Sequence, residues 1–185
     1  MWRTDIPPLL LFVFTDDPPP PPSLLPPPPL FPLLQASYAV GPSADPGTFR
    51  PAKLNTSQWA DVMVGLGAKG AILTAKHGCG HLLWPSKTTL PNGTTYPYSV
   101  GRERSFIKGD VLAQFTASMS ARGIGHGFYY SLTNNFFLNV ISHQAGASKT
   151  LLPGQVNVSQ AEFEAIALAQ VTELWTEYGN LTEIW

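Results

Sequence analysis

Residues 70–86 read GAILTAKHGCGHLLWPS, and the fold that we expect for the chain is inferred first from this segment. Its beginning, residues 71–73, is an uninterrupted apolar run, which is typical of a buried parallel strand. Residues 74–80 are mainly polar or small, and Trp84-Pro85-Ser86 closes the stretch. Because α/β folds bind ligands at the carboxyl ends of their parallel strands, the pattern predicts a strand followed by a functional loop.

A helix, a glycine and a strand follow one another three times along the chain. The first helix is expected to begin at residues 55–57, which are good N-caps, and Gly67 can end it before a strand at 71–75. The same order recurs with helix 109–122, Gly123 and strand 124–132, then with capping box 159–162, Gly179 and strand 181–185. Each helix carries an apolar face, and the three faces are Trp59, Val62, Met63 and Leu66; Val111, Leu112, Phe115 and Met119; and Phe163, Ile166, Ala167, Val171, Leu174, Trp175 and Tyr178.

This alternation is typical of an α/β fold with a parallel sheet. A full (β/α)₈ barrel takes roughly 250 residues, whereas only about three βα units are evident here. We therefore expect residues 45–185 to form a partial (β/α)₈ TIM-like barrel. Its last strand would leave a free edge at Trp185, which is a source of instability or aggregation.

Composition limits the classes of function. The net charge is −1, charged residues make up 12% of the chain and aromatic residues 11%. The sequence shows no basic patch of the kind that binds nucleic acid. Cys79 is the only cysteine, so no internal disulfide is expected.

Residues 1–44 differ in composition from the rest. Twelve of the 19 prolines lie within residues 1–37, so we expect a disordered segment of polyproline type. It is either a linker or ligand for SH3 or WW domains, or non-native sequence from a wrong gene start or mis-spliced exon. The apolar run Ile6–Phe14 is too short to span a membrane, and it makes a poor signal peptide.

Four of the seven asparagines stand in N-x-S/T sequons. We expect glycosylation, and hence passage through the secretory pathway, at Asn55, Asn92, Asn157 and Asn180. The alternative is chance in a threonine-rich sequence.

Several side chains near the expected strand ends could carry chemistry. His77 could hydrogen-bond a sugar hydroxyl or be purely structural. Cys79 could be a thiolate nucleophile or an idle thiol. The histidines have no recognised metal-ligand spacing, so no metal site is expected.

Aromatic rings at or beyond the strand ends could stack on sugars or simply fill the core. These rings are Trp84, Tyr129, Tyr130 and Trp185. Glycoside hydrolysis also needs two carboxyl groups about 5–10 Å apart. The sequence does not supply an evident pair, because Glu183 lies within the last strand and Asp110 starts a helix.

Four stretches resemble the α-L-fucosidases of glycoside hydrolase family 29. They are FRPAKLNTSQWADVM (49–63), GAILTAKHGCGHLLWPS (70–86), GIGHGFYYSLTNNFFLNV (123–140) and QAEFEAIALAQVTELWTEYGNLTEIW (160–185). The resemblance runs from about Asp45 to the end of the chain. It implies a barrel-type catalytic domain that releases terminal α-L-fucose from glycans with retention, using two carboxylates and neither a metal nor an organic cofactor.

The resemblance also assigns roles. His77 matches a fucose-binding histidine, Tyr129 and Tyr130 match a sugar-side aromatic pair, and Trp185 matches a tryptophan two residues before the nucleophile. Many members have a second histidine where this chain has Gly78. The nucleophile is thus expected just after Trp185, and we predict that the 185-residue chain has no hydrolase activity by itself.

Three hypotheses therefore remain open. The chain is a fragment of a fucosidase, a non-catalytic fucose-binding module, or a thiol enzyme that uses Cys79. For either fucose-related reading, the partner is a fucosylated glycan and the location is extracellular, lysosomal or vacuolar.

Overall fold

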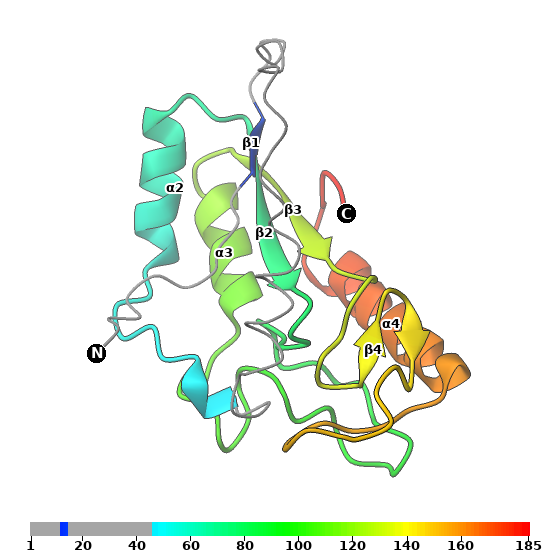
Figure 1. Ribbon diagram of the computed structural model, residues 1–185. Helices are drawn as coiled ribbons and strands as arrows, with labels where there is room; N and C mark the ends of the chain where they lie inside the picture. Colours follow the sequence, from blue (N-terminus) through cyan, green and yellow to red (C-terminus); the bar gives the residue numbers. More distant parts are fainter. Residues whose placement is uncertain (1–11, 15–45) are drawn as a thin grey trace, which may run out of the picture.

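The computed structural model of the protein describes residues 12–14 and 46–185, which form a mixed sheet flanked by helices (Figure 1). In that sheet β2 (Gly70–Lys76) lies between β1 (Phe12–Phe14) and β3 (Gly125–Tyr130). β2 and β3 run parallel, while β1 runs antiparallel to β2. The predicted parallel βα arrangement is therefore confirmed.

The chain end adds a third parallel segment beside β3. The Phe128 amide donates to the Glu183 carbonyl at 3.1 Å, and the Trp185 amide donates to the Phe128 carbonyl at 2.9 Å. Gly127 allows this close approach, because a Cβ there would lie 2.5 Å from the Glu183 carbonyl oxygen. The strand predicted at 181–185 thus pairs as expected, through a parallel bridge between Phe128 and Ile184.

β1 differs from the prediction for the proline-rich head. Residues 12–14, which we expected to be disordered, pair with residues 70–72 of β2. The triplet Phe-Val-Phe contains no proline and has a high β-propensity, which accounts for a strand there. The remaining expectation for residues 1–44 falls outside the described residues.

The two shorter helices begin at predicted caps. Asn55 caps α2 (Thr56–Gly65), and Asp110 caps α3 (Val111–Ser120). All four predicted core residues of α3 are buried. In α2 the prediction is partly wrong, because Val62 and Leu66 are 52% and 62% exposed. The helix instead packs through Ala60 and Met63, a narrow stripe that allows close approach to α3.

The third helix, α4 (Gln160–Glu177), has the predicted capping box between Ser159 and Glu162. Its predicted face is buried apart from Val171, which is half-buried, and Trp175, which is 58% exposed. Gly67, Gly123 and Gly179 follow the three helices with positive φ angles of 73°, 67° and 77°. These left-handed positions favour glycine and turn the chain back toward the sheet.

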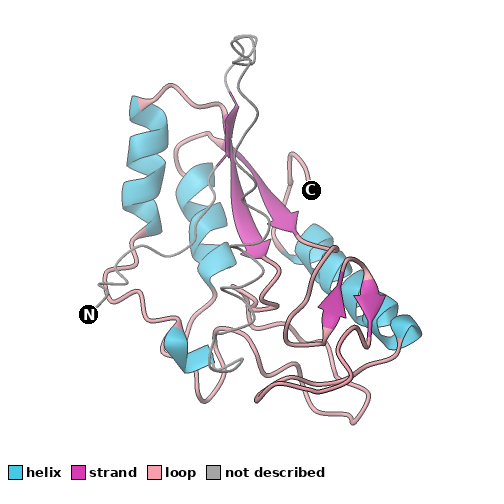
Figure 2. Ribbon diagram, viewed as in Figure 1, coloured by secondary structure: helices cyan, strands magenta, loops and turns pink. Residues whose placement is uncertain are grey.

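α3 and α4 cover the same face of the sheet. The Phe128 ring of β3 lies 6.5 Å from the ring of Phe115 in α3. It lies 5.4 Å from the ring of Tyr178, the residue after α4. A short hairpin, β4 (Val140–Ile141) and β5 (Gln144–Ala145), lies near the start of α4 and was not predicted (Figure 2). Within residues 12–14 and 46–185, no helix is both long and apolar enough to cross a membrane.

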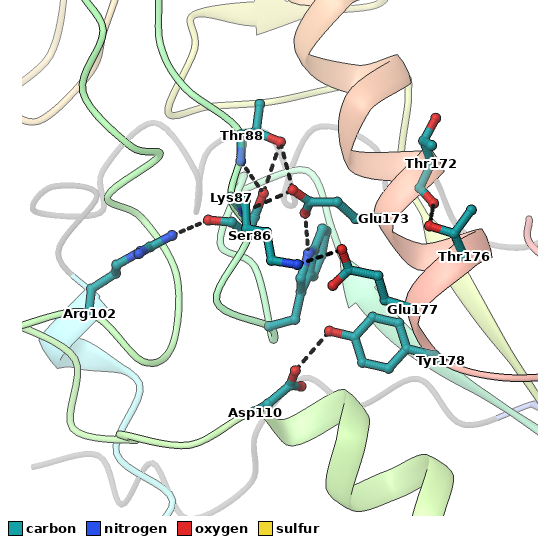
Figure 3. A network of polar contacts seen from close by, with 11 residues as sticks. Ser86, Lys87, Thr88, Arg102, Asp110, Thr172, Glu173, Thr176, Glu177 and Tyr178 are labelled. Carbon is teal, nitrogen blue, oxygen red and sulfur yellow. Dashed lines mark hydrogen bonds and ion pairs between the residues drawn. The ribbon is translucent and has the colours of Figure 1, made fainter.

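A polar network joins α4 to the segment that follows the 70–86 motif (Figure 3). The Glu173 carboxylate accepts hydrogen bonds from the Trp84 indole at 2.7 Å and from the Lys87 amide at 2.9 Å. The Lys87 ammonium forms an ion pair with Glu177 at 2.8 Å. Since Trp84 is 1% exposed, its bond to Glu173 is the shielded part of the network.

Glu173→Ala is expected to lower the free energy of unfolding by about 2 kcal/mol, because it leaves the buried Trp84 indole without its acceptor. Urea denaturation measures the change. Glu164→Ala, on the exposed side of α4, is the matched control and should change stability by less than about 0.5 kcal/mol. An equal loss in both variants would contradict this role.

Candidate functional site

The loops that follow β2 and β3 are joined at the carboxyl edge of the sheet. The Phe136 amide donates to the Gly78 carbonyl at 2.8 Å, and the Phe137 amide donates to the Cys79 carbonyl at 3.2 Å. These two hydrogen bonds fix the main chain of the loop after β2, which the sequence predicted to be functional.

Lys76 connects the two loops from below. Its side chain is fully buried, and its ammonium group donates to the Ser131 carbonyl and, at 2.8 Å, to the Asn134 carbonyl. The nitrogen also lies 4.9 Å from the centre of the Tyr130 ring, close enough for a cation–π contact. Burial lowers the pKa of Lys76 to about 7, so this group can lose its charge near neutral pH.

His77 and Tyr129 form the exposed part of the edge. Their ring centres are 5.7 Å apart, with an angle of 33° between the ring planes. His77 is exposed and Tyr129 is half-buried. Partial burial, followed by the charge of Lys76, lowers the pKa of His77, so its imidazole is neutral at pH 7. A neutral imidazole can both donate a hydrogen bond to a hydroxyl group and accept one.

Trp185 shares a sheet face with Tyr129. Phe128 and Ile184 are bridge partners, so the next residue on each strand points to the opposite face. Trp185 is 48% exposed, and its indole N–H donates to the Glu183 carboxylate. The structure thus places three predicted site residues, the exposed His77 and Trp185 and the half-buried Tyr129, at or just beyond the carboxyl ends of adjacent parallel segments.

The structure does not bring Trp84 and Tyr130 to this position, which corrects two of the predicted sugar contacts. Trp84 is 1% exposed and lies under α4, where Glu173 holds its indole. Tyr130 is 3% exposed, and its hydroxyl donates to Gln170 at 2.7 Å. Because side chains alternate along a strand, Tyr129 and Tyr130 must face opposite sides, and Tyr130 faces the core.

The surroundings of Cys79 do not favour a thiolate nucleophile. The side chain is half-buried, and burial raises the pKa of the Cys79 thiol above its usual value. Its sulfur accepts a hydrogen bond from the His81 amide at 3.5 Å. A thiol that stays protonated at pH 7 is a weak nucleophile.

His81 belongs to an aromatic cluster instead of a metal site. Its ring lies 5.4 Å from the Phe49 ring and 4.9 Å from the Tyr98 ring. Its Nε2 atom is buried and has no hydrogen-bond partner within the described chain. Burial lowers the pKa of His81 to about 4. Across the described ranges, no three His, Cys, Asp or Glu side chains are grouped so that they could hold a metal ion.

All four sequon asparagines are exposed, namely Asn55, Asn92, Asn157 and Asn180. Asn157 differs from the others in that its side-chain oxygen accepts a hydrogen bond from the buried Asn139 at 3.0 Å. Because these side chains are exposed, each position is sterically accessible to glycosylation.

Sequence reasoning missed Lys76 and Asn134 as parts of this edge. A lysine at the end of an apolar strand could have drawn attention to the first, because a buried ammonium group needs acceptors. Nothing in the sequence marked Asn134, since its role depends on the hairpin that follows. An open groove lies elsewhere, between residues 87–89 and α4, and includes neither His77 nor Tyr129.

Comparison with known protein families matches residues 43–185 to the family described as Alpha-L-fucosidase. Among curated proteins, the chain is 34% identical over 142 residues to Alpha-L-fucosidase 1 of Arabidopsis thaliana, covering 77% of this chain and 24% of that protein. It is 28% identical over 136 residues to Plasma alpha-L-fucosidase of Rattus norvegicus, covering 72% and 28%.

A solved structure shares the same fold. The chain superposes on an alpha-L-fucosidase homologue from Bacteroides thetaiotaomicron with a TM-score of 0.64 and 30% identity. The match covers 82% of this chain and 33% of the other. The chain therefore spans about a quarter to a third of the length of these relatives.

The pKa of Lys76 predicts a rise in stability with pH. Between pH 7 and 10.5 the unfolded lysine binds a proton that the folded one has released, so the free energy of unfolding increases with pH. We expect a gain of about 1–2 kcal/mol between pH 7 and pH 8.5, measured by urea denaturation. Lys76→Met should remove this slope, and an unchanged slope in that variant would contradict the assignment.

The lowered pKa of His81 predicts a loss of stability at acid pH. Its folded pKa lies below the unfolded value of 6.5, so stability is complete above pH 6.5 and is lost as the pH falls toward 4. From pH 7 to pH 5 we expect a loss of about 2 kcal/mol from this group. His81→Phe, which preserves the ring contacts, should show a correspondingly smaller acid sensitivity. His77 titrates in the same direction and remains in both proteins, so the difference between them isolates His81.

Proposed function

The chain belongs to the alpha-L-fucosidase family, and from this premise we propose that the edge carrying His77 and Tyr129 is the fucose-binding side of a retaining α-L-fucosidase active site. The observation that supports the proposal most directly is the contact between the exposed His77 ring and the half-buried Tyr129 ring, whose centres are 5.7 Å apart. It stands at the carboxyl end of parallel strands, where barrel enzymes carry their sites.

Each member of the pair has a suitable role. The neutral His77 imidazole would hydrogen-bond a fucose hydroxyl, because a neutral imidazole has one donor and one acceptor nitrogen. The half-buried Tyr129 ring would contact the apolar face of the sugar. Trp185, on the same face as Tyr129, would extend that apolar surface.

The bond-breaking step needs two carboxylates that these side chains do not supply. A retaining enzyme uses one as nucleophile and one as acid and base, about 5–5.5 Å apart. On β2, β3 and residues 182–185, the only carboxylate belongs to Glu183, and it accepts the Trp185 indole hydrogen bond. We therefore propose that the 185-residue chain binds fucose without hydrolysing fucosides.

Membership of the family also supports proposals about the domain organisation, partners and location of the protein. We propose that residues 45–185 are part of a (β/α)₈-type catalytic barrel, that residues 1–44 are a separate segment, and that no cofactor takes part. Fucosylated glycans are the proposed partners. The four exposed sequons favour a glycosylated protein of the secretory pathway, either extracellular or in the lysosome or vacuole.

A non-catalytic glycan-binding module is the second candidate. It is favoured by the same ring pair standing on strands that carry only one carboxylate. The two candidates predict the same binding by this chain, and they differ in whether a longer product of the gene hydrolyses fucosides.

Titration of the chain with L-fucose should give saturable NMR shifts of the His77 and Tyr129 side chains at millimolar ligand. Fucose at ten times its dissociation constant should also stabilise the fold by about 1.4 kcal/mol, which a thermal shift can detect. A chromogenic α-L-fucoside should not be turned over.

Tyr129→Ala is expected to weaken fucose binding about tenfold, because it removes the proposed stacking surface. Trp175→Ala, which removes an exposed aromatic ring on α4, is the matched control and should leave the affinity unchanged. Absence of any binding by the unaltered chain at millimolar fucose would overturn the proposal, and turnover of the fucoside would refute the expected inactivity.

A further inference from the structure

The position after His77 has no side chain, and another residue occupies the adjoining space. A Cβ at Gly78 would lie 3.3 Å from the Asn134 Cβ and 3.9 Å from the Asn134 side-chain nitrogen. Asn134 itself is exposed, whereas Gly78 is buried beneath it. The exposed Asn134 side chain therefore lies against Gly78, the residue that follows His77 in the chain.

The orientation of that amide is fixed by the hairpin. The Ser142 main-chain N–H donates to the Asn134 side-chain oxygen at 2.9 Å. The oxygen is thereby engaged, so the opposite atom, the NH₂ group, is the one left to make further contacts. No hydrogen bond from this NH₂ group is present in the described part of the chain. It is an exposed donor with two N–H bonds available.

The hairpin turn that supplies the Ser142 amide is strained. Ser142 and His143 have φ angles of 50° and 67°, although neither is glycine. Two-residue turns of this kind normally use Asn-Gly or Asp-Gly, and non-glycine residues there cost free energy. Asn139 also has a positive φ of 55°, but hydrogen bonds between its side chain and the Ser148 main chain offset the cost of this conformation.

The side chains of Ser142 and His143 do not offset the backbone strain in this way. Both are exposed and make no hydrogen bond within the described residues. What the turn does provide is two main-chain donors aimed at the loop after β3. The His143 amide donates to the Thr133 carbonyl at 2.7 Å, and the Ser142 amide donates to Asn134. The strained backbone therefore serves to hold Asn134.

Below the loop, Lys76 holds the same residue by its main chain, since the Asn134 carbonyl accepts from the Lys76 side chain at 2.8 Å. Asn134 is thus fixed at its carbonyl and at its side-chain oxygen, while its NH₂ group makes no hydrogen bond to the described residues. Preorganisation of this kind lowers the entropic cost of binding a ligand.

We propose that Asn134 is a sugar-binding residue of the His77–Tyr129 edge, whose side-chain NH₂ donates to a hydroxyl or ring oxygen of the bound fucosyl residue. This inference rests on the proposed function. The ligand class is a neutral, hydroxyl-rich sugar, because the side chains of Asn134 and its exposed neighbours Thr133 and Ser142 are uncharged hydrogen-bonding groups.

The test is an NMR titration of the ¹⁵N-labelled chain with L-fucose. The Asn134 NH₂ signals, assigned by their absence from the spectrum of Asn134→Asp, should shift and saturate with the same dissociation constant as His77. Asn134→Asp keeps an oxygen for the Ser142 amide, so this assignment does not require the hairpin to be disrupted.

Asn134→Ala should weaken fucose binding about threefold to tenfold, the effect of one hydrogen bond. Asn92→Ala is the matched control, since Asn92 is also exposed and its side-chain oxygen likewise accepts a main-chain N–H, from Thr94 at 3.1 Å. It should leave the affinity unchanged. If Asn134→Ala does not fold, the shift of the Asn134 NH₂ signals in the unaltered chain decides alone.

The two proposals fail in different ways. If the chain binds fucose with shifts at His77 while the Asn134 NH₂ signals stay fixed, the role of Asn134 is overturned and the proposed function survives. If the unaltered chain shows no saturable shift at all, both are overturned.

Discussion

The buried amino group of Lys76 is the contact on which the candidate site depends. It stands at the end of β2 and donates to two carbonyl groups in the loop after β3. An amino group removed from water is costly unless such acceptors surround it, and here the Tyr130 ring adds a further favourable contact. The loops that carry His77 and Asn134 are therefore held in one arrangement before any ligand arrives.

Because side chains alternate along the strands, some aromatic residues face the candidate site and others pack in the core. Tyr129 and Trp185 face the side on which the candidate site stands, while Phe128 and Tyr130 face α3 and α4. Trp84 also packs in the core, where its indole donates a hydrogen bond to Glu173 of α4. The same alternation thus lets adjacent residues contribute to the core and to the candidate site.

Strain and rigidity are combined in the hairpin after β3. Its turn places two non-glycine residues in left-handed conformations, and its main-chain donors hold the loop at Thr133 and Asn134. Residues held in sparsely populated conformations tend to gather at binding sites, where the surrounding contacts maintain them. The position of this turn, beside the carboxyl end of β3 in Figure 1, agrees with that tendency.

The order of helices and strands can be predicted from the sequence alone, because apolar periodicity, N-caps such as Asn55 and Asp110, and glycines after each helix act over a few neighbouring residues. The motifs of the family can be recognised in the same way, and they point to His77 and Tyr129 as candidate site residues. The burial of Trp84 and Tyr130, the pairing of residues 12–14 with β2 and the position of Asn134 over Gly78 became evident only from the folded chain. These features depend on contacts between residues 40 or more positions apart, which no local pattern encodes.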